Sequence, residues 1–241
     1  MSGQPPMVLV PGMLCDADLW SDVRTRLDVP TVDAVIDAPT IRAMAEQVLS
    51  SVPGTFILAG LSLGAIVGFE VLRLAPERVA GFCALSTNAA APTTTQKQQW
   101  TELARRTRAG DFAAVVATSI LPQMFATTTP PTQLRQRFLA MADRVGPEVF
   151  ITQLAAQHTR RSAFAALTQT RCPTLVISAG ADRLCPPPYH HSIAASVEYS
   201  CLASLPGAGH VSTWERPDDI AALIHDWLPA TTSQELTCQK F

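Results

Sequence analysis

Short apolar runs alternate with amphipathic segments between residues 7 and 86. The runs are rich in Val, Ile, Leu and Phe, which is typical of strands buried on both faces, whereas apolar residues spaced three or four apart predict helices. We therefore expect strands over residues 7–10, 32–36, 56–60 and 79–86, and helices over residues 18–27, 41–50 and 63–74.

The pattern changes after residue 87. From residue 88 to residue 170 the spacing is helical without clear strand character, which predicts helices over residues 95–108, 112–120, 131–144, 147–158 and 163–168. Strand character returns over residues 173–179 and 199–205, with helices expected over residues 189–196 and 220–228. The polar residues from Pro229 onward are expected to fray.

Strands that alternate with helices predict an α/β fold, in which helices cover both faces of a parallel sheet. The chain leaves this pattern at residue 88 and resumes it after residue 170. We therefore expect one core, formed by residues 1–87 and 171–241, and a helical cap formed by residues 88–170.

Composition narrows the class of protein. The chain has 241 residues, 47% of them hydrophobic and 16% charged, which is typical of a folded protein with a large core. Its formal net charge of −2 argues against a nucleic-acid partner, because such partners normally require a basic surface. No P-loop, GxGxxG or HExxH pattern occurs, so we expect neither a cofactor nor a metal, and no heptad pattern indicates an oligomeric state.

The six cysteines and the first ten residues bear on the compartment. The cysteines are scattered without a CxxC pair, which is typical of reduced thiols. The start of the chain lacks the basic and apolar regions of a signal peptide. The longest nearly apolar stretch, residues 56–69, is shorter than a membrane span. These features predict a cytoplasmic protein without a membrane segment.

A GxSxG motif, Gly60-Leu61-Ser62-Leu63-Gly64, lies between a predicted buried strand and a predicted helix. This context is the one that a nucleophile elbow requires, because the serine sits in a tight turn whose neighbours must lack bulk. The helix N-terminus also favours negative charge that develops beside the serine. We therefore interpret Ser62 as a candidate nucleophile; the alternative is a chance match in a chain rich in small residues.

A serine hydroxyl needs a base, and a base on this fold is expected after an acidic residue in the chain. Asp182 follows the strand predicted over residues 173–179, and His210 follows the strand predicted over residues 199–205 in a glycine-rich loop. The two loops should lie at the same edge of the sheet, where Asp182 would orient the imidazole of His210. The alternatives are a loop cap for Asp182 and a surface position for His210.

Acyl transfer also needs donors for the oxyanion. The residue after the nucleophile, Leu63, would supply one backbone N–H group, and the loop after the first strand would supply the other. In that loop Gly12 allows close approach, and the N–H group of Met13 is our candidate donor. The alternative for Met13 is simple apolar packing.

Candidate substrate contacts come from the same loop and from the predicted cap. Gly12 and Cys15 lie in the loop, although a packed free thiol is an equal interpretation of Cys15. In the cap, helix–helix packing is the alternative for the apolar candidates Trp100, Leu121, Met124, Phe125 and Phe138; the polar candidates are Gln123, His158 and Arg160.

Four segments of the chain carry a resemblance to the α/β-hydrolase superfamily: VLVPGMLCDADLW, AGLSLGAIVGFEVLRLAPERV, CPTLVISAGADRLCPP and LPGAGHVSTWERPDDIAALIHDWL. The chain is most similar to a small bacterial group of serine hydrolases of the carboxylic-ester type with an LPGxLCDxxxW start. The resemblance implies that Ser62, Asp182 and His210 form a catalytic triad and that Met13 and Leu63 form the oxyanion hole. It also implies the α/β-hydrolase fold.

The sequence departs from many of these relatives at three places. It has Pro11-Gly12 where many have His-Gly, and Gly64-Ala65 where many have Gly-Gly. Many relatives also carry an antiparallel hairpin ahead of the first strand, which begins here at residue 7. We therefore expect a reduced sheet of about six parallel strands.

The resulting hypothesis is a serine hydrolase that cleaves a small carboxylic ester, thioester or lactone through an acyl-enzyme. Its partner would be a small-molecule substrate. One alternative is a carbon–carbon bond hydrolase or lyase that uses the same triad. The other is a non-catalytic relative that binds a small ligand, against which the complete set of three candidate groups argues.

Overall fold

The computed structural model describes residues 4–228, so the fraying predicted from Pro229 onward lies outside the described residues. Six strands form one sheet: β1 (Met7–Val10), β2 (Thr31–Asp33), β3 (Phe56–Leu61), β4 (Val79–Leu85), β5 (Thr174–Ala179) and β6 (Ser200–Leu205). Their order is β2-β1-β3-β4-β5-β6, and every neighbouring pair is parallel. The predicted reduced parallel sheet is therefore confirmed, without an antiparallel hairpin among residues 4–228.

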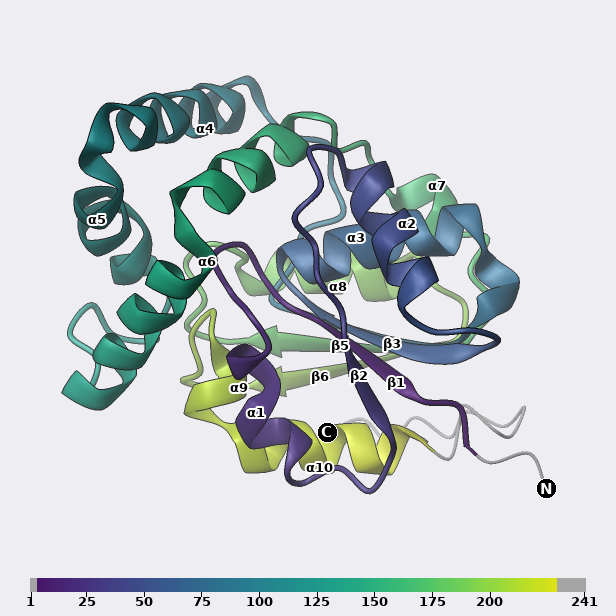
Figure 1. The fold of residues 1–241 in the computed structure, drawn as a ribbon. Helices are drawn as coiled ribbons and strands as arrows, with labels where there is room; N and C mark the ends of the chain where they lie inside the picture. The colour runs from purple at the N-terminus through teal and green to yellow at the C-terminus, as the bar shows by residue number, and fades with distance from the viewer. Residues whose placement is uncertain (1–3, 229–241) are drawn as a thin grey trace.

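Helices cover both faces of this sheet (Figure 1). One face carries α2 (Ile41–Ser51), α3 (Leu63–Leu74) and α8 (Pro187–Ala195), and the other carries α1 (Asp18–Arg24), α9 (Ser212–Glu215) and α10 (Pro217–Trp227). Strand β1 shows why its sequence is uniformly apolar. Met7 and Leu9 enter the core on the side of α1, whereas Val8 and Val10 enter the core on the side of α3.

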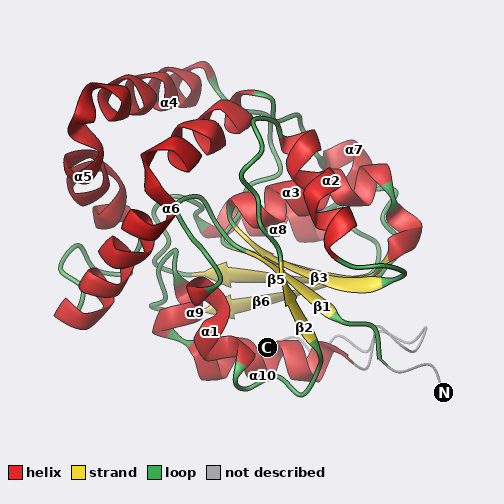
Figure 2. Cartoon of the chain, in the orientation of Figure 1, coloured by secondary structure: helices red, strands yellow, loops and turns green. Residues whose placement is uncertain are grey.

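Between β4 and β5 the described chain contains helices and loops but no strand. Its α-helices are α4 (Thr94–Arg106), α5 (Phe112–Val115), α6 (Thr132–His158) and α7 (Phe164–Leu167), with short π or 3-10 turns at Thr107–Asp111, Val116–Ile120 and Leu121–Gln123. Figure 2 shows α4, α5 and α6 at the edge of the sheet toward which β5 and β6 point, whereas α7 lies beside α3. The assignment of residues 88–170 to a separate cap stays a prediction.

Several boundaries differ from those expected. Strand β2 is shorter than the predicted strand because it is an edge strand and pairs only with residues 7–9 of β1. The helices expected over 131–144 and 147–158 are the two halves of α6, which are separated where Gly146 has a φ of 80°. Helix α9 was not predicted because four residues are too few to show a helical period.

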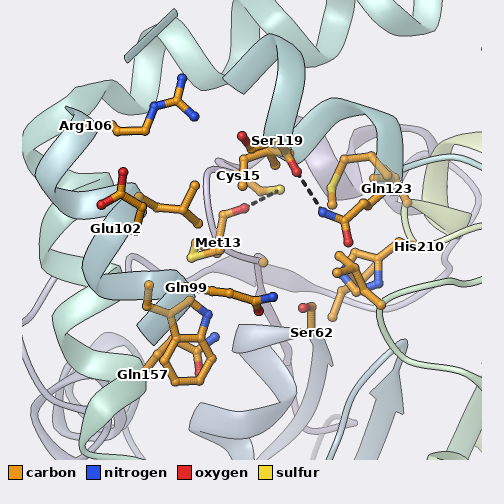
Figure 3. A pocket seen from close by; sticks show the side chains of 18 of the residues that line it. Met13, Cys15, Ser62, Gln99, Glu102, Arg106, Ser119, Gln123, Gln157 and His210 are labelled. Carbon is orange, nitrogen blue, oxygen red and sulfur yellow. Dashed lines mark hydrogen bonds between the residues drawn. The ribbon is translucent and has the colours of Figure 1, made fainter. Parts of the chain in front are cut away.

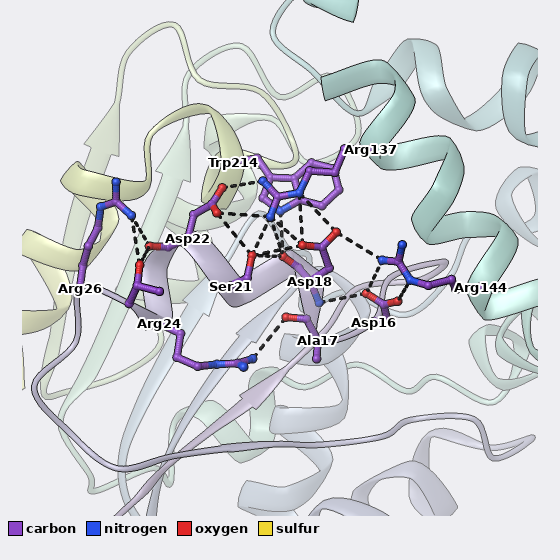
Figure 4. A network of polar contacts seen from close by, with 11 residues as sticks. Asp16, Ala17, Asp18, Ser21, Asp22, Arg24, Arg26, Arg137, Arg144 and Trp214 are labelled. Atoms are coloured by element: carbon purple, nitrogen blue, oxygen red, sulfur yellow. Dashed lines mark hydrogen bonds and ion pairs between the residues drawn. The ribbon is translucent and has the colours of Figure 1, made fainter. Parts of the chain in front are cut away.

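The first half of α6 is held on α1 by charged side chains (Figure 4). Arg137 donates to Asp18 over 2.7 Å, and Arg144 donates to Asp16 over 2.7 Å. The guanidinium of Arg137 also lies 4.4 Å from the ring centroid of Trp214 on α9. Hydrogen bonds from Arg137 lower the pKa of the Asp18 carboxyl below its ordinary value, although partial burial opposes this shift. The network therefore joins α6 to both α1 and α9.

Within residues 4–228, no helix combines the length and the apolar character needed to cross a membrane.

Candidate active site

Ser62 occupies a sharp turn between β3 and α3. Its φ of 57° and ψ of −113° lie outside the regions that non-glycine residues usually adopt. Its own N–H group donates to the carbonyl of Leu85 on β4 over 2.9 Å, which helps to hold this conformation. A strained serine at a helix N-terminus is the local geometry that the GxSxG motif predicts.

Two glycines allow this turn to pack. A Cβ atom on Gly60 would come within 2.5 Å of the backbone nitrogen of Ala65, and a Cβ atom on Gly64 would overlap the carbonyl oxygen of Val10. Helix α3 therefore approaches both its own strand and the neighbouring β1 more closely than any side chain would permit.

Asp182 and His210 come together at the ends of β5 and β6. His210 Nδ1 lies 2.8 Å from Asp182 Oδ2, and the other carboxylate oxygen, Oδ1, accepts the N–H groups of Leu184 and Cys185 over 2.9 Å each. Both side chains are buried. Burial acts to raise the pKa of Asp182, but His210 and the two backbone donors outweigh it, so the pKa lies below its ordinary value. Asp182 is therefore held as a carboxylate beneath the imidazole.

Ser62 and His210 line the same cavity, whose volume is about 570 Å³ (Figure 3). The side chain of Asp182 has no exposed surface and lies behind His210. The cavity is bounded on the other side by residues of α4 and of the segments that follow α5. The three candidate residues thus form a set in which one hydroxyl and one imidazole reach the cavity and the carboxylate supports the imidazole.

The loop after β1 forms the next part of the cavity wall, with Gly12, Met13 and Cys15. It is a tight turn in which the N–H group of Cys15 donates to the carbonyl of Gly12 over 3.2 Å. Leu14 has a φ of 59° and a buried side chain. Leu63 begins α3, so its N–H group has no acceptor within the helix.

Comparison with known proteins identifies the family. Residues 7–223 match the Alpha/beta hydrolase family. The chain belongs to this family.

Solved structures of other proteins share the fold. A thermophilic esterase from Thermogutta terrifontis superposes with a TM-score of 0.87 and 24% identity, over 95% of this chain and 91% of that one. The enol-lactonase from Burkholderia xenovorans LB400 superposes with a TM-score of 0.79 and 20% identity, over 95% of this chain and 92% of that one. At these identities the likeness shows the fold alone.

A curated relative matches over part of its length. The biotin biosynthesis bifunctional protein BioHC of Cellvibrio japonicus is 23% identical over 246 residues, which cover 93% of this chain. The match covers 47% of BioHC, so this chain spans about half the length of that relative.

The alpha/beta hydrolase cavity includes some, but not all, of the predicted substrate contacts. Gly12, Cys15, Trp100, Gln123 and Met124 line it. The other residues expected from the insert do not line it: Leu121, Phe125, Phe138, His158 and Arg160.

Phe125 and His158 show why an aromatic side chain in the insert does not by itself predict a residue that lines the cavity. Phe125 is fully buried and packs edge-on against Phe138, with ring centroids 6.3 Å apart. His158 is exposed at the end of α6, and its ring centroid lies 5.7 Å from that of Trp100. Phe125 and Phe138 therefore serve helix packing, which was the alternative for the apolar candidates, whereas His158 is exposed.

Three glutamines that line the cavity, Gln98, Gln99 and Gln157, were not predicted. With Gln123 they give the cavity a set of neutral amide groups beside the apolar side chains of Trp100 and Met124. Sequence pattern offered no signal for them, because polar residues on a helix usually face water. A polar helix face becomes a cavity wall only when the helix packs over a site.

One group within residues 4–228 has donor atoms spaced like those of a metal site: Asp182, Cys185 and His210, whose ligand atoms lie within 4.8 Å of one another. Asp182 and His210 already share a hydrogen bond. Burial, followed by the charge of Asp182, raises the pKa of the Cys185 thiol well above its ordinary value, whereas metal binding requires the thiolate. The group fits a hydrogen-bonded acid–base pair beside a protonated thiol better than a metal centre.

His190 supports the elbow from behind. Its Nε2 atom accepts the N–H group of Thr87 over 2.9 Å, and the hydroxyl of Thr87 donates to the carbonyl of Ser62 over 3.0 Å. The imidazole is fully buried, and burial lowers its pKa from 6.5 to about 4, although Asp182 opposes the shift. His190 is therefore neutral in the folded protein at neutral pH.

The glycine packing predicts a large stability difference between two Gly→Ala variants. Gly64→Ala should lower the free energy of unfolding by at least about 2 kcal/mol, because the new methyl group overlaps backbone that cannot move aside. Gly12→Ala is the control, since its Cβ would meet neighbours at ordinary distances of 3.5 Å or more. Urea unfolding measures both variants, and equal stability would contradict the packing argument.

The buried His190 predicts a pH-dependent stability. In the unfolded chain the His190 imidazole is protonated below about pH 6.5, whereas in the folded chain it is protonated only below about pH 4. The free energy of unfolding therefore falls as the pH decreases through this window. Between pH 7 and pH 5 the wild type should lose about 2 kcal/mol more than His190→Gln, which keeps an acceptor for Thr87. Urea unfolding at both pH values tests this. His225→Gln, at an exposed site on α10, is the control, and between pH 7 and pH 5 its free energy of unfolding should fall by as much as that of the wild type.

Proposed function

We propose that the protein is a serine hydrolase that cleaves a small carboxylic ester, thioester or lactone through an acyl-enzyme. The observation that carries the proposal is the buried hydrogen bond between Asp182 and His210, with His210 and Ser62 on the wall of one cavity. A nucleophile, a base and a group that orients the base are the parts that this chemistry needs.

In the proposed reaction, the Nε2 atom of His210 takes the proton from the Ser62 hydroxyl as Oγ attacks the substrate carbonyl carbon. Asp182 accepts the Nδ1–H group, which selects the reactive tautomer and stabilises the imidazolium. The tetrahedral intermediate then collapses as His210 protonates the leaving alcohol or thiol. Water, deprotonated by His210, attacks the acyl-enzyme, and His210 then returns this proton to Ser62 Oγ as the acid is released. A lactone follows the same steps, with the leaving alcohol still attached to the acyl group.

The N–H groups of Met13 and Leu63 are proposed to stabilise the oxyanion. Leu63 offers a donor that helix α3 leaves unpaired, at the end of the helix where the dipole favours negative charge. Met13 follows Gly12 on the cavity wall, next to the turn that carries Ser62. Two such donors contribute most to catalysis when they are already in place before charge develops.

The cavity supports a small substrate. Its volume of about 570 Å³ suits a molecule of modest size, and its wall combines apolar side chains and amide groups with the charged side chains of Glu102 and Arg106. We assign the choice of acyl group to residues 88–170, the proposed cap, because Trp100, Met124 and Gln157 from this segment line the same cavity as Ser62. The esterase and the enol-lactonase with the same fold support an ester or lactone as the substrate class.

Replacement of the nucleophile tests the proposal. Ser62→Ala should lower kcat for p-nitrophenyl butyrate by at least about 10⁴-fold, since the residual rate comes only from binding and the oxyanion donors. Ser192→Ala, at an exposed position on α8, is the control and should keep wild-type kcat. A fluorophosphonate probe should label the wild type and Ser192→Ala but not Ser62→Ala. Wild-type protein that neither hydrolyses the ester nor reacts with the probe would refute the proposed function.

A further inference from the structure

Gln153 links helix α6 to two loops at the edge of the sheet. It lies in the second half of α6 and is almost fully buried. Its Oε1 atom accepts the N–H group of Leu14 over 3.0 Å, and its Nε2 atom donates to the carbonyl of Ile36 over 3.0 Å. Leu14 belongs to the loop after β1, and Ile36 to the loop after β2, so one buried amide side chain holds three segments together.

The turn that Gln153 contacts has an unfavourable conformation for its sequence. The bond from Cys15 N–H to the Gly12 carbonyl makes Met13 and Leu14 the two central residues of a four-residue turn. The second central residue has a positive φ of 59°, a position that normally takes glycine or asparagine. Leu14 occupies it instead. A hydrogen bond to the N–H group of Leu14 therefore offsets an intrinsic preference for another backbone conformation.

The same bonds fix both peptide planes that flank Met13. Because peptide units are planar, the bond to the Gly12 carbonyl orients the N–H group of Met13 in the same unit. The following unit, from the Met13 carbonyl to the Leu14 N–H group, is held by Gln153 on one side and by the Cys15 thiol, 3.4 Å from the Met13 oxygen, on the other. Figure 3 shows the contact between Cys15 and Met13 at the cavity wall.

We infer that Gln153 is a positioning residue for the oxyanion hole: by accepting the Leu14 N–H group from α6, it maintains the turn that directs the Met13 N–H group toward the oxyanion. The inference rests on the proposed function. Gln153 does not line the cavity, so it acts through the loop and not on the substrate. Through Gln153, helix α6 supports the loop after β1, and through Gln157 the same helix lines the cavity.

Gln153→Met tests the inference, because methionine has a similar length and flexibility but forms neither hydrogen bond. With p-nitrophenyl butyrate, kcat should fall at least about tenfold and KM should change less than about threefold, as expected when a donor that acts mainly in the transition state is misplaced. The affinity for an alkyl trifluoromethyl ketone, whose hemiketal oxyanion occupies the same hole, should fall in parallel with kcat. Gln153→Leu removes the same bonds and serves if Gln153→Met does not fold.

Leu154→Ala is the matched control. Leu154 is the next residue on α6 and equally buried, so its truncation weakens helix packing without removing either bond of Gln153. It should lower the melting temperature and leave kcat and the ketone affinity within about threefold of wild type. The inference is overturned if the Gln153 variants retain wild-type kcat, or if Leu154→Ala reproduces their loss of kcat and ketone affinity.

The two proposals fail in different ways. If wild-type protein neither hydrolyses esters nor reacts with the fluorophosphonate, the proposed function is wrong and the inference falls with it. If the wild type and Leu154→Ala are active and the Gln153 variants are equally active, the hydrolase assignment stands and only the role of Gln153 is refuted.

Discussion

The close approach of helix α3 to strands β1 and β3 is the constraint on which the rest of the site depends. Gly60 and Gly64 lie at positions where any side chain would clash with backbone atoms. Because they have none, helix α3 can begin directly after strand β3. This contact leaves Ser62 with a positive φ at the helix N-terminus. It also places the first turn of α3 against the carbonyls of Val10 and Pro11, and the loop after β1 therefore begins beside the nucleophile elbow. The nucleophile elbow and the loop after β1 are therefore held in place by the same packing contact, that of Gly64 against Val10 and Pro11.

The two buried acid–base groups behind the cavity differ in charge, although burial favours the neutral form of both. Asp182 is buried, but His210 and two backbone N–H groups favour its charged form, so its pKa falls. His190 is buried with a single backbone donor at Nε2, and burial dominates, so it stays neutral. The site consequently holds one carboxylate beneath the candidate base and a neutral imidazole beneath the elbow. The charge of His210 and the hydrogen bonds to Asp182, and not burial alone, decide which of the two groups carries charge.

Helix α6 connects the insert to the core at two points of different character. Its first half is held by partly exposed ion pairs from Arg137 and Arg144 to the acidic residues around α1. Its second half is held by the buried hydrogen bonds of Gln153. Partly exposed ion pairs are screened by salt, whereas buried hydrogen bonds are not. The attachment next to the candidate oxyanion loop is therefore the one that is insensitive to ionic strength.

The candidate residues Ser62, Asp182 and His210 could be located from the sequence because each follows a short apolar run, and parallel strands bring such positions to one edge of a sheet. The parallel sheet itself followed from the same runs. The cavity wall followed only in part. Gln98, Gln99 and Gln157 lie on helices whose polar residues give no sign of facing a site, while the apolar Phe125 packs in the core and does not line the cavity. Local pattern thus determined the strands, the elbow and the order of the candidate catalytic groups. The tertiary structure alone decided which insert residues reach the cavity or the loop, because contacts such as that between Leu14 and Gln153 join residues 139 positions apart.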